Sequence, residues 1–454
     1  YDSVLEIETQ MGETDYITGI GFQKNISDFL QSINEVAKTP GDNTARSALV
    51  QSAVQFIDSA QTIYKGLVNY QSNLNAEIKT TVGRINEIGS QLVTLNRNIS
   101  KIETGGYETA SNLRDQRDML LDELSSYCKI TYNEGDNGSV EVYIEGNKFA
   151  DEMSYNSLQC KAFQGTDLVD IVWPAFNEES LYSYSEVIAT SKNTDIGGLK
   201  GLFIARGAST PTYEHADMKE PVPDDYITAQ YPDGTGNPEY LRRKNEYDLY
   251  TQSVDTSALV NTIANFDKLI SSMVQEINNV FCPEETGKEY TVLDTDKAPT
   301  TTDGEYGIEL FTRDFCDRYT VTNINGTDYY VRNNINTFGN NSAYTIMNIS
   351  VNKDIVQDYS KIPLSGNGGD AYNTAKELVD VFSKKIMRYN DSFDGMTFEE
   401  FYESMINDVA NTGKIYNSMS TNETTLASQL DNQRQQVMGV ASDAVSYTHL
   451  TLPT

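Results

Sequence analysis

The stretch from Thr44 to Glu103 constrains the fold more than any other part of the sequence. It contains no proline, and its only glycines are Gly66, Gly83 and Gly89. At 1.5 Å per residue, a helix of this length spans roughly 80–90 Å, so we expect an elongated body. In its second half, apolar residues recur at alternating steps of three and four, which is the spacing of a coiled-coil seam. These seam residues are Ile85, Ile88, Leu92, Leu95, Ile99 and Ile102.

The partner of this seam is left open by the sequence. An apolar stripe on a long helix most often packs against helices of the same chain. Here those would be a second helix over residues 108–127, closing a long antiparallel hairpin, and helices near the C-terminus. The alternative is direct contact with another subunit. In both interpretations the polar residues Asn86 and Asn96 are expected on the other faces of the helix.

The hydrophobic period changes from that of a helix to that of a strand after Cys128, where Ile130 and Tyr132 alternate with polar residues. The predicted fold class is therefore α+β and multidomain: an elongated helical rod, built from long antiparallel helices at both ends of the chain, with inserted β-rich domains. Further helices are expected near residues 28–36, 256–281, 371–389, 398–410 and 421–440. The predicted segments are 1–128 (rod), 129–196 (β-rich insertion), 197–282 (return helices of the rod, with a Pro-rich acidic loop at 208–246), 283–345 (β-rich outer domain), 346–445 (C-terminal rod helices) and 446–454 (tail).

The charge balance argues against two classes of partner. The chain has 34 Lys and Arg against 66 Asp and Glu, which gives a net charge of −32 at pH 7. Such a chain repels nucleic-acid phosphates and anionic lipid headgroups, so we expect no nucleic-acid binding. The sequence also has no apolar run of about 18 residues and no basic segment followed by an apolar one, so we expect no membrane insertion and no signal peptide.

Residues that carry chemistry are scarce. The two histidines, His215 and His449, belong to no HExxH motif, and neither a phosphate-binding GxxxxGK[ST] loop nor a GxSxG motif occurs. The Gly-rich run at 365–370 is interpreted as a turn that caps the following helix. Four cysteines lie far apart without a CxxC pair, so free thiols are expected, with a Cys282–Cys316 disulfide as the alternative. We therefore predict no enzyme, and no catalytic, cofactor or metal site.

Several segments carry a resemblance to a known family. The clearest is residues 112–125, NLRDQRDMLLDELS, followed by a hairpin ending in VEVYIEGNKF at 140–149. Residues 198–206, GLKGLFIAR, and LDNQR at 430–434 add to it. Together they resemble the flagellar hook-associated protein 1 family. The residues that carry the signature are Leu113, Arg114, Asp115, Gln116, Arg117, Asp118 and Leu121.

The resemblance implies a structural protein of the bacterial flagellum that joins hook to filament and allows the filament to assemble. The partners it implies are like subunits in a ring, the hook protein, a second junction protein, the filament, and an export chaperone bound through a C-terminal helix. It also implies an extracellular location, reached by type III export without a cleaved signal peptide. The family's two terminal helices have no counterpart here, so we expect the 454 residues to remain monomeric and residues 446–454 to be a non-native tail.

A binding module is the competing hypothesis. The Pro-rich loop and much of 283–345 do not share the resemblance, and the region 208–345 contains many tyrosines, whose flat rings stack on sugars. It is therefore interpreted, in the alternative, as a surface-exposed adhesin or glycan-binding module on a flagellar axial protein.

Overall fold

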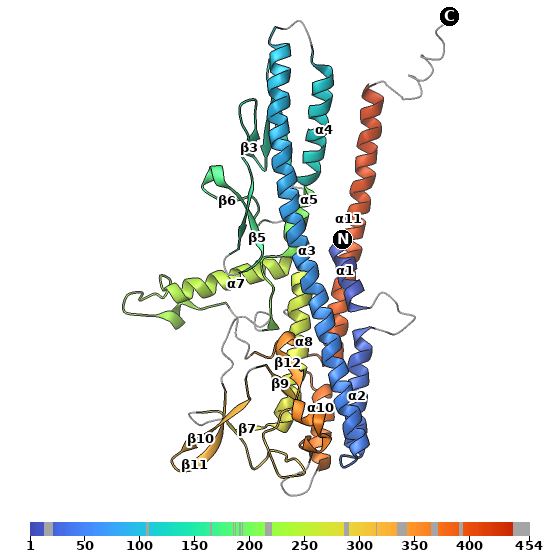
Figure 1. The fold of residues 1–454 in the computed structure, drawn as a ribbon, viewed down its shortest axis with the longest axis vertical. Helices are drawn as coiled ribbons and strands as arrows, with labels where there is room; N and C mark the ends of the chain where they lie inside the picture. Colours follow the sequence, from blue (N-terminus) through green and yellow to red (C-terminus); the bar gives the residue numbers. More distant parts are fainter. Residues whose placement is uncertain are drawn as a thin grey trace, which may run out of the picture.

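The computed structural model is a long rod of helices with small sheets along one side (Figure 1). It describes residues 1–12, 21–105, 109–163, 166–184, 186, 188–189, 192, 194–213, 220–285, 290–314, 316–333, 343–364, 371–389 and 394–438. The α+β architecture expected from the sequence is confirmed. Within the described residues, no helix is long and apolar enough to cross a membrane.

Helix α3 is the longest element and runs along most of the rod (Figure 1). In the described part of the chain, three further helices come from its first third and six from the rest. Among the described residues the helices are α1 (Asp2–Met11), α2 (Phe22–Lys38), α3 (Asn43–Glu103), α4 (Ser111–Tyr127), α5 (Gly198–Arg206), α7 (Pro238–Thr256), α8 (Ala258–Phe281), α9 (Lys353–Gln357), α10 (Ala371–Ser383) and α11 (Phe398–Met438).

The strands form small antiparallel sheets in two regions. Residues 130–180 supply the sheets β1-β2-β3 and β4-β5-β6, and residues 284–351 supply β10-β11-β8-β7 and the pair β12-β9. The strands are β1 (Ile130–Glu134), β2 (Val140–Ile144), β3 (Asn147–Ala150), β4 (Gln159–Ala162), β5 (Val169–Trp173), β6 (Glu179–Ser180), β7 (Glu284–Glu285), β8 (Val292–Leu293), β9 (Phe311–Arg313), β10 (Tyr319–Ile324), β11 (Thr327–Arg332) and β12 (Ile349–Val351).

The long helix predicted from the sequence is confirmed. Asp42 caps it, because its side chain accepts a hydrogen bond from the Thr44 backbone N–H at 2.9 Å. Its 61 residues correspond to about 90 Å. The chain then reverses into α4, which packs back along α3, so the predicted antiparallel hairpin is also confirmed (Figure 1).

Two apolar clusters line α3. The upper cluster, named for the position of its elements in Figure 1, joins the second half of α3 to α4, α5 and the strands of residues 130–180. Trp173 and Phe149 are fully buried in it. The lower cluster joins its first half to α2, α8, α10, α11 and to residues from 293–351. Within it, the Phe29 and Phe56 rings stack with their centroids 5.1 Å apart. One helix therefore contributes a face to both cores.

Two helices differ from the sequence expectation. The predicted loop at 208–246 ends earlier, because α7 begins at Pro238. Asn237 caps this helix through a 2.9 Å hydrogen bond from the Glu239 N–H, and a proline fits its first turn because no N–H is needed there. The two helices expected at 398–410 and 421–440 are instead one helix, α11. Its Gly413 is no helix break: a Cβ there would lie 2.9 Å from Val4 Cγ1, so this glycine lets α1 pack closely.

Some sequence predictions fall on residues outside the described part of the chain. These are His215, His449, the Gly-rich turn at 365–370 and the tail at 446–454. The four cysteines are described, and all four are free thiols. The alternative of a Cys282–Cys316 disulfide is therefore wrong.

Two glycines of α3 give a matched prediction. Gly83 is exposed and has no atom within 4 Å of an added Cβ, whereas a Cβ on Gly89 would lie 2.7 Å from Phe149 Cζ and 2.8 Å from a Tyr155 ring carbon. Gly83→Ala should stabilise the chain by about 0.5–1 kcal/mol because alanine favours the helix. Gly89→Ala should destabilise it by about 1–3 kcal/mol because it overpacks the contact with β3. Urea unfolding followed by circular dichroism measures both, and equal shifts of the two midpoints would contradict the packing argument.

Candidate functional site

Three asparagines on α3 bind the backbone of the β-rich insertion. Each side-chain amide donates one hydrogen bond to a backbone carbonyl and accepts one from a backbone N–H of the docked segment. Asn96 donates to the Val140 carbonyl at 2.9 Å and accepts from the Val140 N–H at 3.1 Å. Asn86 does the same with Leu158, at 2.9 Å in both directions. Asn75 donates to the Asp167 carbonyl at 3.2 Å and accepts from the Val169 N–H at 3.0 Å.

These contacts solve a general problem of packing a strand or loop on a helix. The backbone N–H and C=O groups of the helix are already hydrogen-bonded to one another, so the docked segment cannot pair with them. A buried peptide group without a hydrogen bond lowers the stability of the folded chain. A carboxamide carries the same donor and acceptor as a peptide group and replaces it. Asn278 of α8 repeats the arrangement with Phe311 of β9, donating at 2.7 Å and accepting at 3.1 Å.

The predicted seam is only partly buried. Ile85, Ile88, Leu92 and Ile99 are fully buried, but Leu95 is half-buried and Ile102 is 41 % exposed. A straight helix has 3.6 residues per turn, so a pattern written in steps of 3.5 drifts around it. Asn96, not Leu95, therefore faces the sheet, and the expectation that Asn86 and Asn96 lie on other faces is wrong.

The environment of the seam also differs from the expectation. Ile85, Ile88 and Leu92 belong to the apolar cluster formed with α4 and with strands β2, β3 and β5. The C-terminal helix α11 packs instead on α1, α2 and α8. The expected contact between the seam and the C-terminal helices is therefore wrong.

The signature segment fastens the tip of the α3–α4 hairpin to the first sheet. Arg114 pairs with Glu103 of α3, with 2.8 Å from Nε to Oε1, and with Glu134 of β1 at 2.7 Å. Arg117 is 3 % exposed, donates to the Gly138 carbonyl at 2.7 Å and lies 3.6 Å from Glu134. The hydrogen bond from Arg114 is the main reason that the pKa of Glu103 falls to about 2.

The remaining signature residues differ in how far their side chains are buried. Leu121 is buried in the upper cluster, and Leu113 is half-buried. Asp115, Gln116 and Asp118 are exposed. The segment therefore buries Arg117 and Leu121, leaves Leu113 and Arg114 half-buried, and presents its other polar side chains on the surface.

A fully buried arginine connects α3, α5 and β5. Arg206 donates from Nη1 to Asn75 Oδ1 at 2.8 Å and to the Val169 carbonyl at 2.6 Å, and from Nη2 to the Tyr184 hydroxyl at 3.1 Å. Its guanidinium also lies 5.2 Å from the Phe203 ring centroid. Arg206 ends the GLKGLFIAR segment, so sequence reasoning found the segment but not this role.

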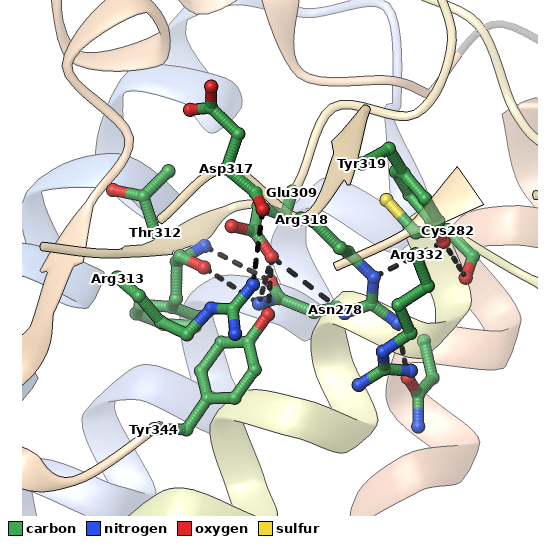
Figure 2. A network of polar contacts seen from close by, with 12 residues as sticks. Asn278, Cys282, Glu309, Thr312, Arg313, Asp317, Arg318, Tyr319, Arg332 and Tyr344 are labelled. Atoms are coloured by element: carbon green, nitrogen blue, oxygen red, sulfur yellow. Dashed lines mark hydrogen bonds and ion pairs between the residues drawn. The ribbon is translucent and has the colours of Figure 1, made fainter. Parts of the chain in front are cut away.

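A second polar network joins α8 to residues between 284 and 344 (Figure 2). Glu309 is buried and accepts hydrogen bonds from Tyr344 at 2.7 Å and Asn278 at 3.1 Å. Burial raises the pKa of Glu309, while the Tyr344 hydrogen bond and the Arg318 charge oppose this shift. Arg318 reaches Glu284 at 3.0 Å, and Arg332 binds the same carboxylate. Glu284 is the first residue of β7 and Arg332 is the last residue of β11, so the network connects the four-stranded sheet to α8.

The described side chains offer little for catalysis. Burial raises the pKa of Cys128 and of Cys282 to about 12, so both stay protonated and are poor nucleophiles at neutral pH. Within the described residues, no group of three or more His, Cys, Asp or Glu side chains is placed to hold a metal ion. The polar residues that the fold brings together join helices to sheets.

Known proteins with similar sequences are flagellar hook-associated proteins. A sequence profile described as the flagellar hook-associated protein FlgK helical domain matches residues 6–230. The flagellar hook-associated protein 1 of Bacillus subtilis is 33 % identical over 146 residues, which cover 32 % of this chain and 28 % of that protein. The protein of the same description from Salmonella typhimurium is 21 % identical over 431 residues, covering 92 % and 74 %.

A solved structure has the same fold. The flagellar hook junction protein FlgK from Burkholderia pseudomallei superposes with a TM-score of 0.59 at 12 % identity, over 95 % of this chain and 97 % of that one. Fold, polar contacts and comparisons together define a structural component of the bacterial flagellum. Within that class, the chain belongs to the flagellar hook-associated protein 1 family.

The asparagine contacts predict a large difference between two neighbouring positions. Asn96→Asp should lower the free energy of unfolding by about 2–4 kcal/mol, because it removes the buried donor and places a carboxylate against the Val140 carbonyl. Asn98→Asp, on the exposed side of the same helix turn, should cost less than about 0.5 kcal/mol. Urea unfolding measures both, and similar losses at the two positions would contradict the assigned role of Asn96.

The Glu103–Arg114 pair predicts a pH dependence. The pKa of Glu103 is about 2 in the folded chain and roughly 4.3 in an unfolded one, so the pair stabilises fully above the higher value and less as pH falls toward the lower. Glu103→Gln should cost about 1 kcal/mol at pH 7, and this difference should shrink as pH falls below about 4. Glu87→Gln, which removes an exposed partner of Arg84, is the control. Unfolding midpoints measured at several pH values check this, and a difference that stays constant with pH would refute it.

Proposed function

We propose that this chain is a structural subunit of the hook–filament junction and that it allows the filament to assemble on the hook. The observation that carries the proposal is the match to the Salmonella typhimurium hook-associated protein 1 along 92 % of the chain. The rod of long helices supports it, because a junction between a flexible hook and a stiffer filament needs length and many parallel contacts rather than a reactive site. The proposed role is therefore mechanical and not enzymatic.

The surface of α11 supports assembly with other subunits. Ile415, Met419, Leu426 and Leu430 are each between 54 and 57 % exposed. Ile415 and Leu426 are 11 residues apart, as are Met419 and Leu430. Because 11 residues make about three helical turns, the four side chains share one face. In the described residues, the second half of this helix is exposed from Lys414 to Leu430. Large apolar side chains in a row on an exposed helix are typical of an interaction surface.

The proposed partners follow from that surface and from the family. They are like subunits in a ring, the hook protein, a second junction protein and the filament, with an export chaperone bound through the family's terminal helix that follows α11. The exposed end of the seam, Ile102 with half-buried Leu95, is a second surface available to a neighbouring subunit. We place the protein outside the cell, at the hook–filament junction, after type III export without a cleaved signal peptide.

The glycan-binding hypothesis for residues 208–345 gains no support. The comparisons point to flagellar hook-associated proteins. Leu293, Leu310, Phe311 and Tyr344 of this region are buried in the same cluster as α2, α3 and α8. These side chains contribute to the rod's own core, which leaves the structural proposal as the better account.

Deletion of the gene in its host tests the proposal. The mutant should form hooks without filaments and should release filament subunits into the medium, because nothing at the hook tip would nucleate the filament. Electron microscopy and immunoblotting of the medium provide the two measurements. Normal filaments and normal motility in the mutant would refute the junction role.

The α11 surface is tested by complementation of the same mutant. A gene carrying Leu426→Glu and Leu430→Glu should restore few or no filaments, because two charges would replace the apolar row. Ser428 lies on the other side of the helix between these leucines, so Ser428→Glu is the matched control and should restore filaments. Full rescue by the double variant would argue against this surface.

A further inference from the structure

We propose that Asn325 is a site of spontaneous deamidation, and that Asn137 resists the same reaction because the fold holds its side chain. Asn325-Gly326 and Asn137-Gly138 are both Asn-Gly pairs, the sequence most open to this chemistry because glycine leaves the following amide unhindered. A third pair, Asn367-Gly368, lies outside the described residues. The two described pairs lie in β-hairpin turns, so they differ in environment rather than in sequence.

The reaction uses only the chain and water. The Gly326 backbone nitrogen attacks Cγ of Asn325, forming an N–Cγ bond, while the Cγ–Nδ2 bond breaks. Ammonia leaves with the proton given up by the Gly326 nitrogen, and a succinimide ring remains. Water then opens the ring at either carbonyl and leaves aspartate or isoaspartate. The net change replaces the side-chain amide by a carboxylic acid and releases one ammonia.

Asn325 is exposed at the tip of the β10–β11 hairpin. It has a positive φ of 54° and Gly326 one of 89°, as a tight two-residue turn between strands requires. Among the described residues, the Asn325 side chain has no hydrogen-bond partner. The turn is held at Gly326, whose N–H donates to Asn323 Oδ1 at 3.1 Å.

The rest of the hairpin does little to hold this tip. Residues 320–323 of β10 are all exposed, although strand residues alternate between two faces, so neither face of this strand is covered. Among the described residues, strand β11 pairs with β8 at Val331↔Val292, far from the turn. An isolated two-stranded hairpin is marginally stable in water, so its end opens readily and lets the Gly326 nitrogen reach Asn325.

Asn137 has the same neighbour but a different environment. Its Nδ2 donates to Ser100 Oγ of α3 and to Glu152 Oε2, both at 2.9 Å. Its Oδ1 accepts from the Ser139 hydroxyl at 2.7 Å. The adjoining Gly138 carbonyl accepts from buried Arg117, and a Cβ on Gly138 would lie 2.1 Å from Glu103 Oε2. Attack at Asn137 therefore requires several contacts to break first.

Deamidation would change the hairpin in two ways. It adds a negative charge three residues before Asp328, whose carboxylate accepts a hydrogen bond from Asn323 at 2.7 Å. Isoaspartate also adds a methylene to the backbone of a two-residue turn, so the flanking pair Ile324↔Thr327 cannot keep its register. The product is a chain with an altered and more acidic hairpin end.

The test follows both sites in one sample. The purified 454-residue chain is incubated at mildly alkaline pH, digested, and the peptides sequenced by mass spectrometry, with a mass increase of about 1 Da for each conversion. In the folded chain, Asn325 should convert roughly tenfold faster than Asn137 or more, because opening precedes attack at Asn137. In concentrated urea the two rates should become similar. Equal rates in the folded chain, or no conversion at Asn325, would overturn the proposal.

A variant tests the protection of Asn137 directly. Ser100→Ala combined with Glu152→Gln weakens the contacts to Asn137 Nδ2 and leaves the β10–β11 hairpin unchanged. Conversion at Asn137 should rise several-fold while that at Asn325 stays constant, with the retained fold checked by circular dichroism. An unchanged rate at Asn137 would show that these hydrogen bonds do not protect it. Asn325→Asp provides the mass and chromatographic standard for the aspartate product.

Discussion

Side-chain amides that stand in for peptide groups hold this molecule together at the points where sheets meet helices. Asn75, Asn86 and Asn96 lie 10 or 11 residues apart, about three turns, so they form one row along α3. Each satisfies a backbone donor and a backbone acceptor of the β-rich insertion. Apolar packing alone would leave those groups buried and unpaired, at a cost of about 1–3 kcal/mol for each group. The insertion therefore docks in one register.

The sequence predicted the helical frame because that frame depends on local periodicity. The long helix, its return through α4 and the helix over Ala258–Phe281 follow from apolar spacing and from the absence of proline. The role of the asparagine row was not predicted, because a polar residue beside an apolar stripe is usually a surface residue. Its repeat of 10 or 11 residues was the available signal, but its meaning depends on a strand that meets the helix from elsewhere in the chain.

The candidate site was predictable as a location and not as a mechanism. The resemblance pointed to residues 113–121, but the partners of Arg114 and Arg117 lie on α3, at the end of β1 and in the turn before β2. The role of Arg206 could not be predicted for the same reason, since its hydrogen-bond acceptors lie at residues 75, 169 and 184. Contacts of this range depend on tertiary placement. The errors over α7 and α11 were local: Pro238 was assigned to the Pro-rich loop although it begins α7, and one continuous helix, α11, was predicted as two.

The combination of apolar and polar contacts bears on how such a rod carries force. Apolar side chains resist separation but give little directional resistance to sliding, because the hydrophobic effect depends on buried area. Hydrogen bonds depend on angle and distance, so they resist displacement along the helix axis. The amide row and Arg206 lie between α3 and the β-rich insertion, where an axial load would act as shear. Displacement along α3 would break these contacts together, and the molecule would therefore transmit axial force as one body.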